Sequence, residues 1–364
     1  MITLPQPAGL FVATGLAMLT LFLALASAQL LLRADRRRRA RRGGPARRLL
    51  FALAAGDQEA ADKLVRLPTR TWHAAEQTAV ALVGEVRGEA RDALLEVFER
   101  RGAAAVALRR LRSRSVVRRG TAAELVGSLR QRAAVPALAA LLTDPALEVR
   151  MVAARSLGRI GDPSAVGALL DSLVGSRMPQ QVVAHSLMGL GQPAVKRLID
   201  ALAHDDPQAR ATVVEVLGLI QAKGAVAALI DVLRQDSVLE VKIRAVRALG
   251  RLGTPAALGP LLDAASADQP PVLRTVAAQA LGQLGDPVAS LRLTVLLSDP
   301  VYRVAHNAAN ALLRLGESGD RVLRSYAARG TGLAAGHARE ALAFDALSAQ
   351  RPEAGSVASS HERT

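Results

Sequence analysis

The sequence predicts an all-α protein, a right-handed α-solenoid of stacked helix pairs preceded by one transmembrane helix. Three observations predict this fold. Half of the 364 residues are hydrophobic but only 2% are aromatic, so the core must be built from Ala, Leu and Val, which suits closely packed helices. A short phrase recurs every 30 to 32 residues, and an uncharged apolar stretch lies near the N-terminus. The absence of Cys excludes a disulfide framework, Cys-ligated zinc and a thiol nucleophile.

The first predicted element is a transmembrane helix over residues 9–32. The stretch carries no charge, and as a helix it would be about 36 Å long, enough to cross a hydrocarbon core of about 30 Å. The competing interpretation is a cleaved signal peptide, because residues 26–28 read Ala-Ser-Ala and resemble a cleavage site. A membrane anchor is favoured because no positive charge precedes the apolar run and many arginines follow it.

An Arg-rich juxtamembrane linker is predicted over residues 33–48, which carry a net charge of +8. Positive charge is retained on the cytoplasmic side of a membrane span. The sequence therefore predicts a single-pass protein of the cytoplasmic (inner) membrane, with its N-terminus outside and its solenoid in the cytoplasm. The residues assigned to membrane or anionic-lipid contact are Arg33, Arg36, Arg37, Arg38, Arg39, Arg41, Arg42, Arg47 and Arg48.

Residues 49–112 read as degenerate helical N-terminal repeats. Residues 82–88 resemble a repeat junction, but Gly84 lies 43 residues before Gly127, the equivalent glycine of the next unit. About a dozen residues, 100–111, are therefore inserted relative to the period of about 31 residues. We expect an additional basic helix in this insertion.

A second basic patch follows from the charge distribution. Residues 100–119 contain eight Arg and no acid, so this block and residues 33–48 together exceed the whole chain's net charge of +15 by one. A lipid-facing patch, a solvated helix face and a nucleic-acid contact are all open interpretations; nucleic acid is disfavoured because Trp72 stands alone as a stacking platform. The residues assigned to this patch are Arg109, Arg110, Arg112, Arg114, Arg118 and Arg119.

Residues 113–319 are predicted to form the repeats themselves. The phrase Leu-Gly-x-Ile/Leu-Gly-Asp-Pro is clearest at 157–163 and 281–287. Equivalent positions are spaced 31, 30, 30, 32, 32 and 31 residues apart; they are 127, 158, 188, 218, 250, 282 and 313. Self-similarity at such a steady period indicates a repeat architecture.

Each repeat reads as two helices. In the clearest copy, residues 134–142 form the first helix and residues 149–160 form the second. Gly161 is suited to the positive φ of a helix C-cap, and the Pro at 163 prevents the helix from continuing. One helix pair cannot bury both of its apolar stripes, so stability must accumulate along the stack.

These units resemble HEAT repeats of the short bacterial type, the kind also found in phycobilin-lyase-like proteins. The resemblance rests on the Asp-Pro turn, the Val-Arg-x-x-Ala-Ala start of the second helix and the Leu-Gly-x-Leu-Gly-Asp-Pro ending. It implies a ladder between adjacent repeats, built from an Asp and an Arg six residues later; a groove for an acidic peptide is the alternative role. The residues assigned to the ladder or groove are Asp144, Arg150, Arg210, Asp236, Lys242, Asp268 and Arg274.

One repeat departs from this pattern. The unit that holds Gln180 has no Asp upstream, and Met178-Pro179 stands at the start of its second helix. We therefore expect a local bend or weak joint there. Beyond the repeats, residues 320–347 are predicted to close the stack as a helical cap, and residues 348–364 to form a disordered tail.

No catalytic or metal-binding constellation is evident in the sequence. The six His occupy different repeat registers, and the one His-Glu pair, His361-Glu362, lies in the predicted tail. Deoxyhypusine hydroxylases, which are also built of HEAT repeats, hold metal with such pairs, so the resemblance does not imply that activity here. We expect no cofactor, no metal and no enzymatic activity.

The predicted function is that of a membrane-tethered scaffold or adaptor, whose solenoid binds a protein partner at the inner face of the membrane. Two alternatives remain open. The first is a HEAT-repeat enzyme, for example a lyase-like one. The second is a membrane-tethered nucleic-acid binder that uses residues 100–119. The expected partners are a protein together with membrane and anionic lipid, and nucleic acid is not expected.

Overall fold

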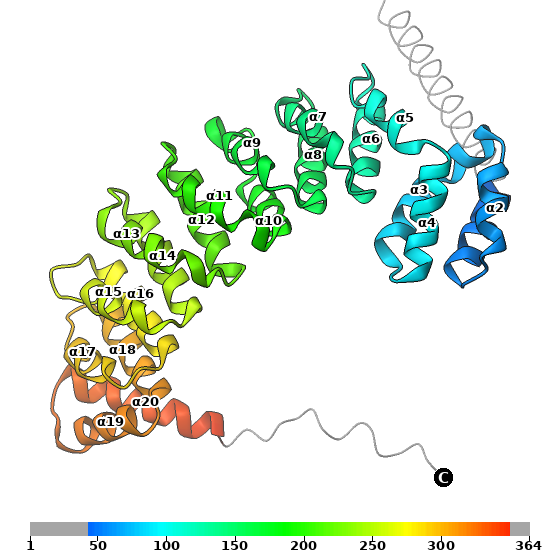
Figure 1. Cartoon of the computed structure of the whole chain (residues 1–364). Coiled ribbons are helices and arrows are strands. Elements are labelled where there is room, and N and C mark those ends of the chain that lie inside the picture. Colours follow the sequence, from blue (N-terminus) through cyan, green and yellow to red (C-terminus); the bar gives the residue numbers. More distant parts are fainter. Residues whose placement is uncertain (1–42, 350–364) are drawn as a thin grey trace, which may run out of the picture. The chain divides into compact units, whose positions relative to one another are not determined.

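The computed structural model describes residues 43–349, and every regular element in that range is a helix. These residues form two compact units, 43–110 and 111–349. In the second unit, helix pairs stack side by side along the chain (Figure 1). The all-α solenoid predicted from the sequence is therefore confirmed.

The predicted location in a membrane is contradicted. Among residues 43–349, none of the helices combines the length and the apolar character needed to cross a bilayer. This finding overturns the prediction of a single-pass membrane protein with its N-terminus outside. The predicted span 9–32 and the arginines of 33–42 lie outside the described residues.

The first unit packs short helices around an aromatic pair. The buried rings of Trp72 and Phe98 meet in a T-shaped contact with 5.2 Å between ring centres. The Arg101 guanidinium lies 4.7 Å from the centre of the Trp72 ring and donates to backbone carbonyls at the C-terminal end of α2 (Glu59–Arg66). Burial lowers the pKa of Arg101. The helices of this unit are 43–54, α2 (Glu59–Arg66), α3 (Thr69–Glu85), α4 (Glu89–Arg100) and α5 (Ala103–Arg110).

The second unit is built from alternating helices of unequal length. The longer, even-numbered helices are α6 (Val116–Ser128), α8 (Leu147–Ile160), α10 (Gln180–Leu190), α12 (Pro207–Leu219), α14 (Leu239–Leu252), α16 (Pro271–Leu284), α18 (Tyr302–Arg314) and α20 (Leu333–Ala349). The odd-numbered helices are α7 (Val135–Ala140), α9 (Val166–Asp171), α11 (Val195–Asp200), α13 (Val226–Gln235), α15 (Leu258–Ala264), α17 (Ala289–Leu296) and α19 (Glu317–Arg329).

Short 3-10 turns extend many of the odd-numbered helices. They are η1 (Arg132–Ala134), η2 (Leu141–Thr143), η3 (Pro163–Ala165), η4 (Val174–Ser176), η5 (Gln192–Ala194), η6 (Ala201–Ala203), η7 (Lys223–Ala225) and η8 (Pro255–Ala257). The helix predicted over residues 134–142 is thus an α-helix with a 3-10 turn on each side. Gly161 ends α8 with a φ of 75°, the positive value expected at this cap. At the C-terminus α19 and α20 close the stack, and residues 350–364 of the predicted tail lie outside the described range.

Successive even-numbered helices cross at glycines. A Cβ on Gly218 of α12 would lie only 2.8 Å from the Cβ of Ala248 on α14, and a Cβ on Gly158 only 2.7 Å from a carbonyl oxygen of α10. Neither distance is possible for a real side chain, so these backbones approach more closely than any larger residue permits. The repeat glycines found in the sequence that lie at such crossings are Gly127, Gly158, Gly218, Gly250 and Gly282, and Gly189 of α10 lies equally close to Gly158 of α8.

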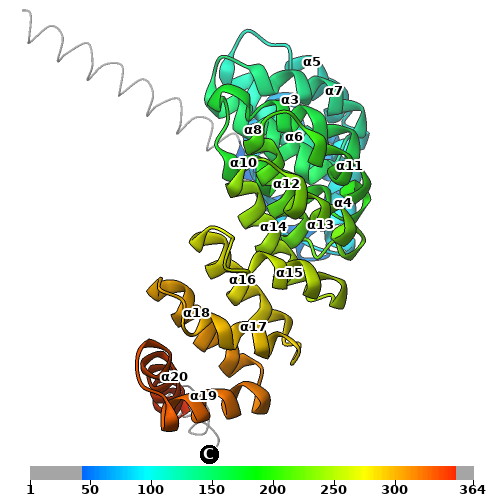
Figure 2. The same ribbon diagram turned by 90° about the vertical axis from the view of Figure 1, so that its left-hand side faces the viewer.

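The two kinds of helix form two layers of the second unit. Figure 1 shows the even-numbered helices α8 to α18 along the inner side of the bent row and their odd-numbered partners along the outer side. The view turned by 90° shows the same two layers (Figure 2). We call the exposed residues of α8, α10, α12, α14, α16 and α18 the inner face.

Candidate functional site

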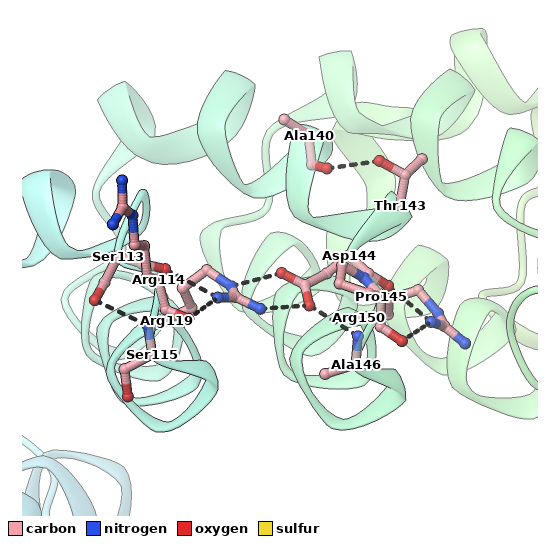
Figure 3. A network of polar contacts seen from close by, with 10 residues as sticks. All are labelled: Ser113, Arg114, Ser115, Arg119, Ala140, Thr143, Asp144, Pro145, Ala146 and Arg150. Carbon is pink, nitrogen blue, oxygen red and sulfur yellow. Dashed lines mark hydrogen bonds and ion pairs between the residues drawn. The ribbon is translucent and has the colours of Figure 1, made fainter.

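A buried ion pair links the first two repeats of the second unit. Arg119 on α6 donates from Nε to Oδ2 of Asp144 at 2.6 Å and from a terminal nitrogen to Oδ1 at 2.8 Å (Figure 3). The exposed fractions of the two side chains are 12% and 4%. Oδ1 of Asp144 also accepts the backbone N–H of Ala146 at 2.9 Å. The planar guanidinium thus meets the carboxylate through two hydrogen bonds, the strong geometry for such a pair.

The same arrangement recurs twice along the stack. Arg210 on α12 donates to both oxygens of Asp236 at 2.8 and 3.1 Å. Arg274 on α16 donates to both oxygens of Asp299 at 2.9 and 3.0 Å. In each case the carboxylate also accepts the backbone N–H two residues further on. We call these three Arg–Asp pairs the rungs of the ladder.

Two of the rungs, Arg119–Asp144 and Arg210–Asp236, shift the pKa values of their members. The Arg119 hydrogen bond, together with the N–H of Ala146, holds the pKa of the Asp144 carboxyl below its usual value despite partial burial. Burial raises the pKa of Asp236, but the Arg210 hydrogen bond and a backbone N–H more than offset that effect, so the pKa is lowered. The pKa of Arg210 is raised by its hydrogen bond to Asp236. These carboxylates therefore stay ionised well below neutral pH.

The other residues assigned to the ladder or groove lie elsewhere. Arg150 donates to the backbone carbonyl of Asp144 in its own repeat at 2.7 Å and to that of Arg177 in the next repeat at 3.1 Å. Lys242 reaches a backbone carbonyl at 3.4 Å. The carboxylate of Asp268 accepts a hydrogen bond from the side-chain amide of Gln269 at 3.2 Å. Each rung joins an Arg to the Asp of the following repeat, 25 or 26 residues later.

The predicted second basic patch is divided between the two units and is partly neutralised. Arg109 and Arg110 belong to the first unit, where Arg110 lies 3.7 Å from Glu76. Arg119, assigned from the sequence to this patch, is instead the first rung of the ladder. The remaining members, Arg112, Arg114 and Arg118, are exposed at the start of the second unit. From the lipid-contact set, only Arg47 and Arg48 fall within the described residues, in the helix 43–54.

The inner face carries two arginine pairs that the sequence assignment missed. Arg155 and Arg159 are exposed on α8, and Arg247 and Arg251 are exposed at the equivalent positions of α14. Within residues 43–349 none of the four forms an ion pair, and the one hydrogen bond made by their side chains runs from Arg159 to Ser128 at 3.4 Å. The signal was the phrase Arg-x-Leu-Gly-Arg, which occurs at 155–159 and 247–251.

The inner face between these pairs carries no net positive charge. On α12, Glu215 is paired with Arg244, which also contacts Glu240 of its own helix at 2.8 Å. Leu219 of α12 is 41% exposed, and the equivalent position on α10 is the exposed Gly189. An apolar, nearly neutral stretch therefore separates two clusters of unpaired positive charge.

Beyond α14 the inner face becomes richer in uncharged amides. The positions equivalent to the arginine pair are Gln279 and Gln283 on α16, and Asn310 and Arg314 on α18. A pocket of about 300 Å³ opens there. Its lining residues are Gln279, Asn307, Asn310, Ala311, Leu313, Arg314 and Asp345.

Two further polar clusters occur in the second unit. Tyr302 on α18 donates to Glu340 on α20 at 2.9 Å, and both His306 and His337 lie 3.6 Å from the same carboxylate. The second cluster lines an open groove of about 580 Å³ between α11 and α13, which includes His204 and the rung at Arg210. Within the described residues no group of three or more His, Asp or Glu side chains is placed to hold a metal ion.

Comparison with known proteins identifies the repeats. Residues 104–191 and 195–282 match the family model for HEAT repeats, so the chain contains HEAT repeats. No curated protein matches the sequence.

Several solved structures are similar. One is the complex of CpcE and CpcF of phycocyanin lyase from Nostoc sp. PCC7120, with 26% identity over 61% of this chain and 92% of that chain and a TM-score of 0.31. The karyopherin Kap121p bound to the SUMO protease Ulp1p matches at 15% identity over 81% of this chain and 40% of that chain, with a TM-score of 0.48. Human deoxyhypusine hydroxylase matches at 18% identity over 68% of this chain and 96% of that chain, with a TM-score of 0.29. These similarities carry no inference about activity.

Proposed function

We propose that this HEAT-repeat array is a binding module that recognises a protein partner through the inner face of its even-numbered helices, and that the partner presents an acidic segment there. A stack of repeats offers an extended surface on which many modest contacts add up. The repeats themselves favour a protein partner in general. The arginine pairs on the inner face narrow the choice to an acidic one.

The single observation that carries the proposal is the pair of exposed, unneutralised arginines on each of α8 and α14. Like charges four residues apart on a helix destabilise it by about 0.2–0.5 kcal/mol. Arg155 therefore repels Arg159, and Arg247 repels Arg251, while the dipole of each helix favours the second Arg of the pair, which lies in the last turn. The rungs that stabilise the stack use other arginines. A role in binding an anion accounts for paired positive charge that the stack itself leaves unneutralised.

The arrangement favours an acidic protein over a nucleic acid. A phosphate backbone presents evenly spaced negative charge and is bound by a continuous basic track, often with aromatic side chains under the bases. Here Glu215 and Leu219 interrupt the basic residues, and α8 to α16 contain no Phe, Tyr or Trp. An acidic segment with carboxylates in separate clusters fits this pattern better.

We propose a binding role without catalysis. The carboxylates with lowered pKa values serve structural contacts: Asp144 and Asp236 form rungs, Asp162 accepts the backbone N–H of Ser164, and Glu340 accepts the hydroxyl of Tyr302. A catalytic acid or base needs a pKa tuned toward the working pH, whereas each of these is tuned away from it. Retention of a stoichiometric metal or turnover of a metabolite by the purified full chain would contradict this proposal.

The test is a binding titration with a fluorescent oligoglutamate peptide, followed by anisotropy on the full chain. Arg247→Gln with Arg251→Gln should weaken binding about tenfold, because each exposed Arg–carboxylate contact contributes roughly 0.5–1 kcal/mol. Lys196→Gln with Arg197→Gln, at exposed positions of α11, is the matched control for loss of two charges and should change affinity little. Equal losses in the two variants, or tighter binding of a single-stranded RNA of the same length, would overturn the proposal.

A further inference from the structure

The ladder is interrupted between α10 and α12. Gln180 of α10 occupies the position that Arg119, Arg210 and Arg274 hold in their helices, and it donates to Thr212 at 3.0 Å. His204 occupies the position of the ladder Asp, and its Nδ1 accepts the backbone N–H of Asp206 at 3.0 Å. Neither charged member of a rung is present, so no Arg–Asp rung ties these two repeats together; the polar side-chain contacts between them include the Gln180–Thr212 hydrogen bond and an approach of His204 Nε2 to 3.5 Å from Asp171 on α9.

The close glycine crossing is also missing at this point. Met188 stands where α6, α8, α12, α14 and α16 have glycine. Among successive even-numbered helices from α6 to α18, α10 and α12 pack against each other least closely. The neighbouring joints keep at least the glycine: Gly158 allows α8 to approach α10, and Gly218 allows α12 to approach α14. Among the joints between successive even-numbered helices from α6 to α18, the α10–α12 joint alone lacks both the glycine and the rung.

This joint lies between the two arginine pairs. The pair on α8 precedes it and the pair on α14 follows it, three helix positions further along the inner face (Figure 1). Neighbouring helix axes are about 8–10 Å apart, which places the two pairs roughly 24–30 Å from each other. An extended chain covers that span in about eight residues at about 3.3 Å each.

We propose that the partner carries two acidic clusters about eight residues apart in an extended segment. One cluster binds Arg155 and Arg159, and the other binds Arg247 and Arg251. This bridging contact fixes the α10–α12 joint. The inference rests on the function proposed above. It adds the spacing of the clusters and a mechanical consequence of binding. Leu219, exposed between the pairs, favours an apolar residue near the middle of the segment.

Bridging has a thermodynamic consequence. Once the first cluster is bound, the second binds as an intramolecular event whose effective concentration depends on how well the span is matched. A loose joint spreads the distance between the pairs and costs affinity, whereas a fixed joint would be preorganised. Binding of a matched segment and stiffening of the joint must therefore favour each other equally.

The first test varies the spacing in the peptide. Peptides with two glutamate doublets separated by about eight residues, with one central Leu, should bind the full chain at least tenfold more tightly than peptides with a two-residue spacer or a single doublet. The variant Gln180→Arg with His204→Asp restores the two charged positions of a rung and should increase affinity for the matched peptide several-fold. It should leave the single-doublet peptide unchanged, which separates a preorganised joint from a gain of charge.

The second test measures the joint directly. Because the chain contains no Cys, spin labels can be placed at Gly167→Cys and Ala227→Cys, exposed positions on α9 and α13 on either side of the joint. Electron–electron distance measurements should give a broad distribution that narrows when the matched peptide binds. Labels at Ala227→Cys and Leu291→Cys span the same number of repeats without the joint and should give a narrow distribution throughout.

The outcomes distinguish the two proposals. Equal affinity for all spacings, or a distribution across the joint as narrow as the control in the free protein, would overturn this inference. The proposed function would survive that result if Arg247→Gln with Arg251→Gln still weakened binding. Failure of every acidic peptide to bind would overturn both.

Discussion

Replacing Gly218 by Ala tests whether the glycine crossings set the spacing of the repeats. The added Cβ would lie 2.8 Å from the Cβ of Ala248 and 2.9 Å from its Cα, so α12 and α14 must move apart. Overpacking a well-packed contact costs about 1–3 kcal/mol, while Ala in place of Gly within a helix gains up to about 1 kcal/mol. The net expectation is a loss of about 1–2 kcal/mol in the free energy of unfolding.

The assay is urea unfolding of the full chain followed by circular dichroism at the helical band, with Gly167→Ala as the matched control. Gly167 is also helical, but nothing lies within 4 Å of the position that its Cβ would take. The same substitution there should raise stability by about 0.4–1 kcal/mol. If Gly218→Ala were neutral or stabilising, the close crossing would not be a determinant of the stack, and our account of the weak joint at α10 would fail with it.

The remaining predictions concern the polar contacts. The Arg119 hydrogen bond lowers the pKa of Asp144. The stability that this rung contributes is therefore fully present above the unfolded-state pKa of about 3.9 and is lost as pH falls through the lower folded-state pKa. Arg119→Gln should flatten the acid limb of a profile of unfolding free energy against pH. Arg274→Met leaves the buried Asp299 without its partner and should cost about 3 kcal/mol, measured by urea unfolding, and adding Asp299→Asn should recover part of that loss. Glu340→Gln removes the carboxylate shared by α18 and α20 and should increase hydrogen exchange in α20, whereas unchanged protection would show that apolar packing alone holds the cap.

Much of the fold was predictable because its determinants are local. A glycine with positive φ followed by Asp-Pro ends a helix whatever surrounds it, as at Gly161. Glycine at a fixed period allows close helix crossing, and that period was visible at Gly158, Gly218, Gly250 and Gly282. These signals need no long-range information, so the repeat units and their boundaries emerged from the sequence.

The ladder was predicted only in part, because its partners come from different repeats. The resemblance to HEAT repeats directed attention to an Asp and an Arg six residues apart within one unit. In the structure Arg210 reaches Asp236 of the following unit. A period of about 31 residues less this offset of six gives 25, so the spacing was implied once both numbers were known. Arg119 was assigned to the basic patch because it lies in an Arg-dense stretch, where the many neighbouring arginines make its position within the repeat hard to recognise.

The weak joint was predicted from one of its features. Gln180 was visible in the sequence, and the structure adds His204 at the position of the ladder Asp and Met188 at the glycine position. The prediction of a membrane location was wrong, because none of the helices in residues 43–349 is long and apolar enough to cross a bilayer. That prediction came from hydropathy and charge in residues 9–48, most of which lie outside the described range.

The position of an arginine relative to the repeat glycine decides what the arginine does. Eight residues before that glycine, at Arg119, Arg210 and Arg274, the side chain lies over the next repeat and is neutralised by its Asp. Three residues before it and one after it, as at Arg155 and Arg159, the side chain lies on the inner face and stays unpaired within the described chain. A net charge of +15 therefore overstates the charge available to a partner, because the arginines of one register are used in folding. The inner face can gain or lose charge through changes at the other two registers without disturbing the rungs, which is why we expect the arginine pairs to control affinity while the stack remains intact.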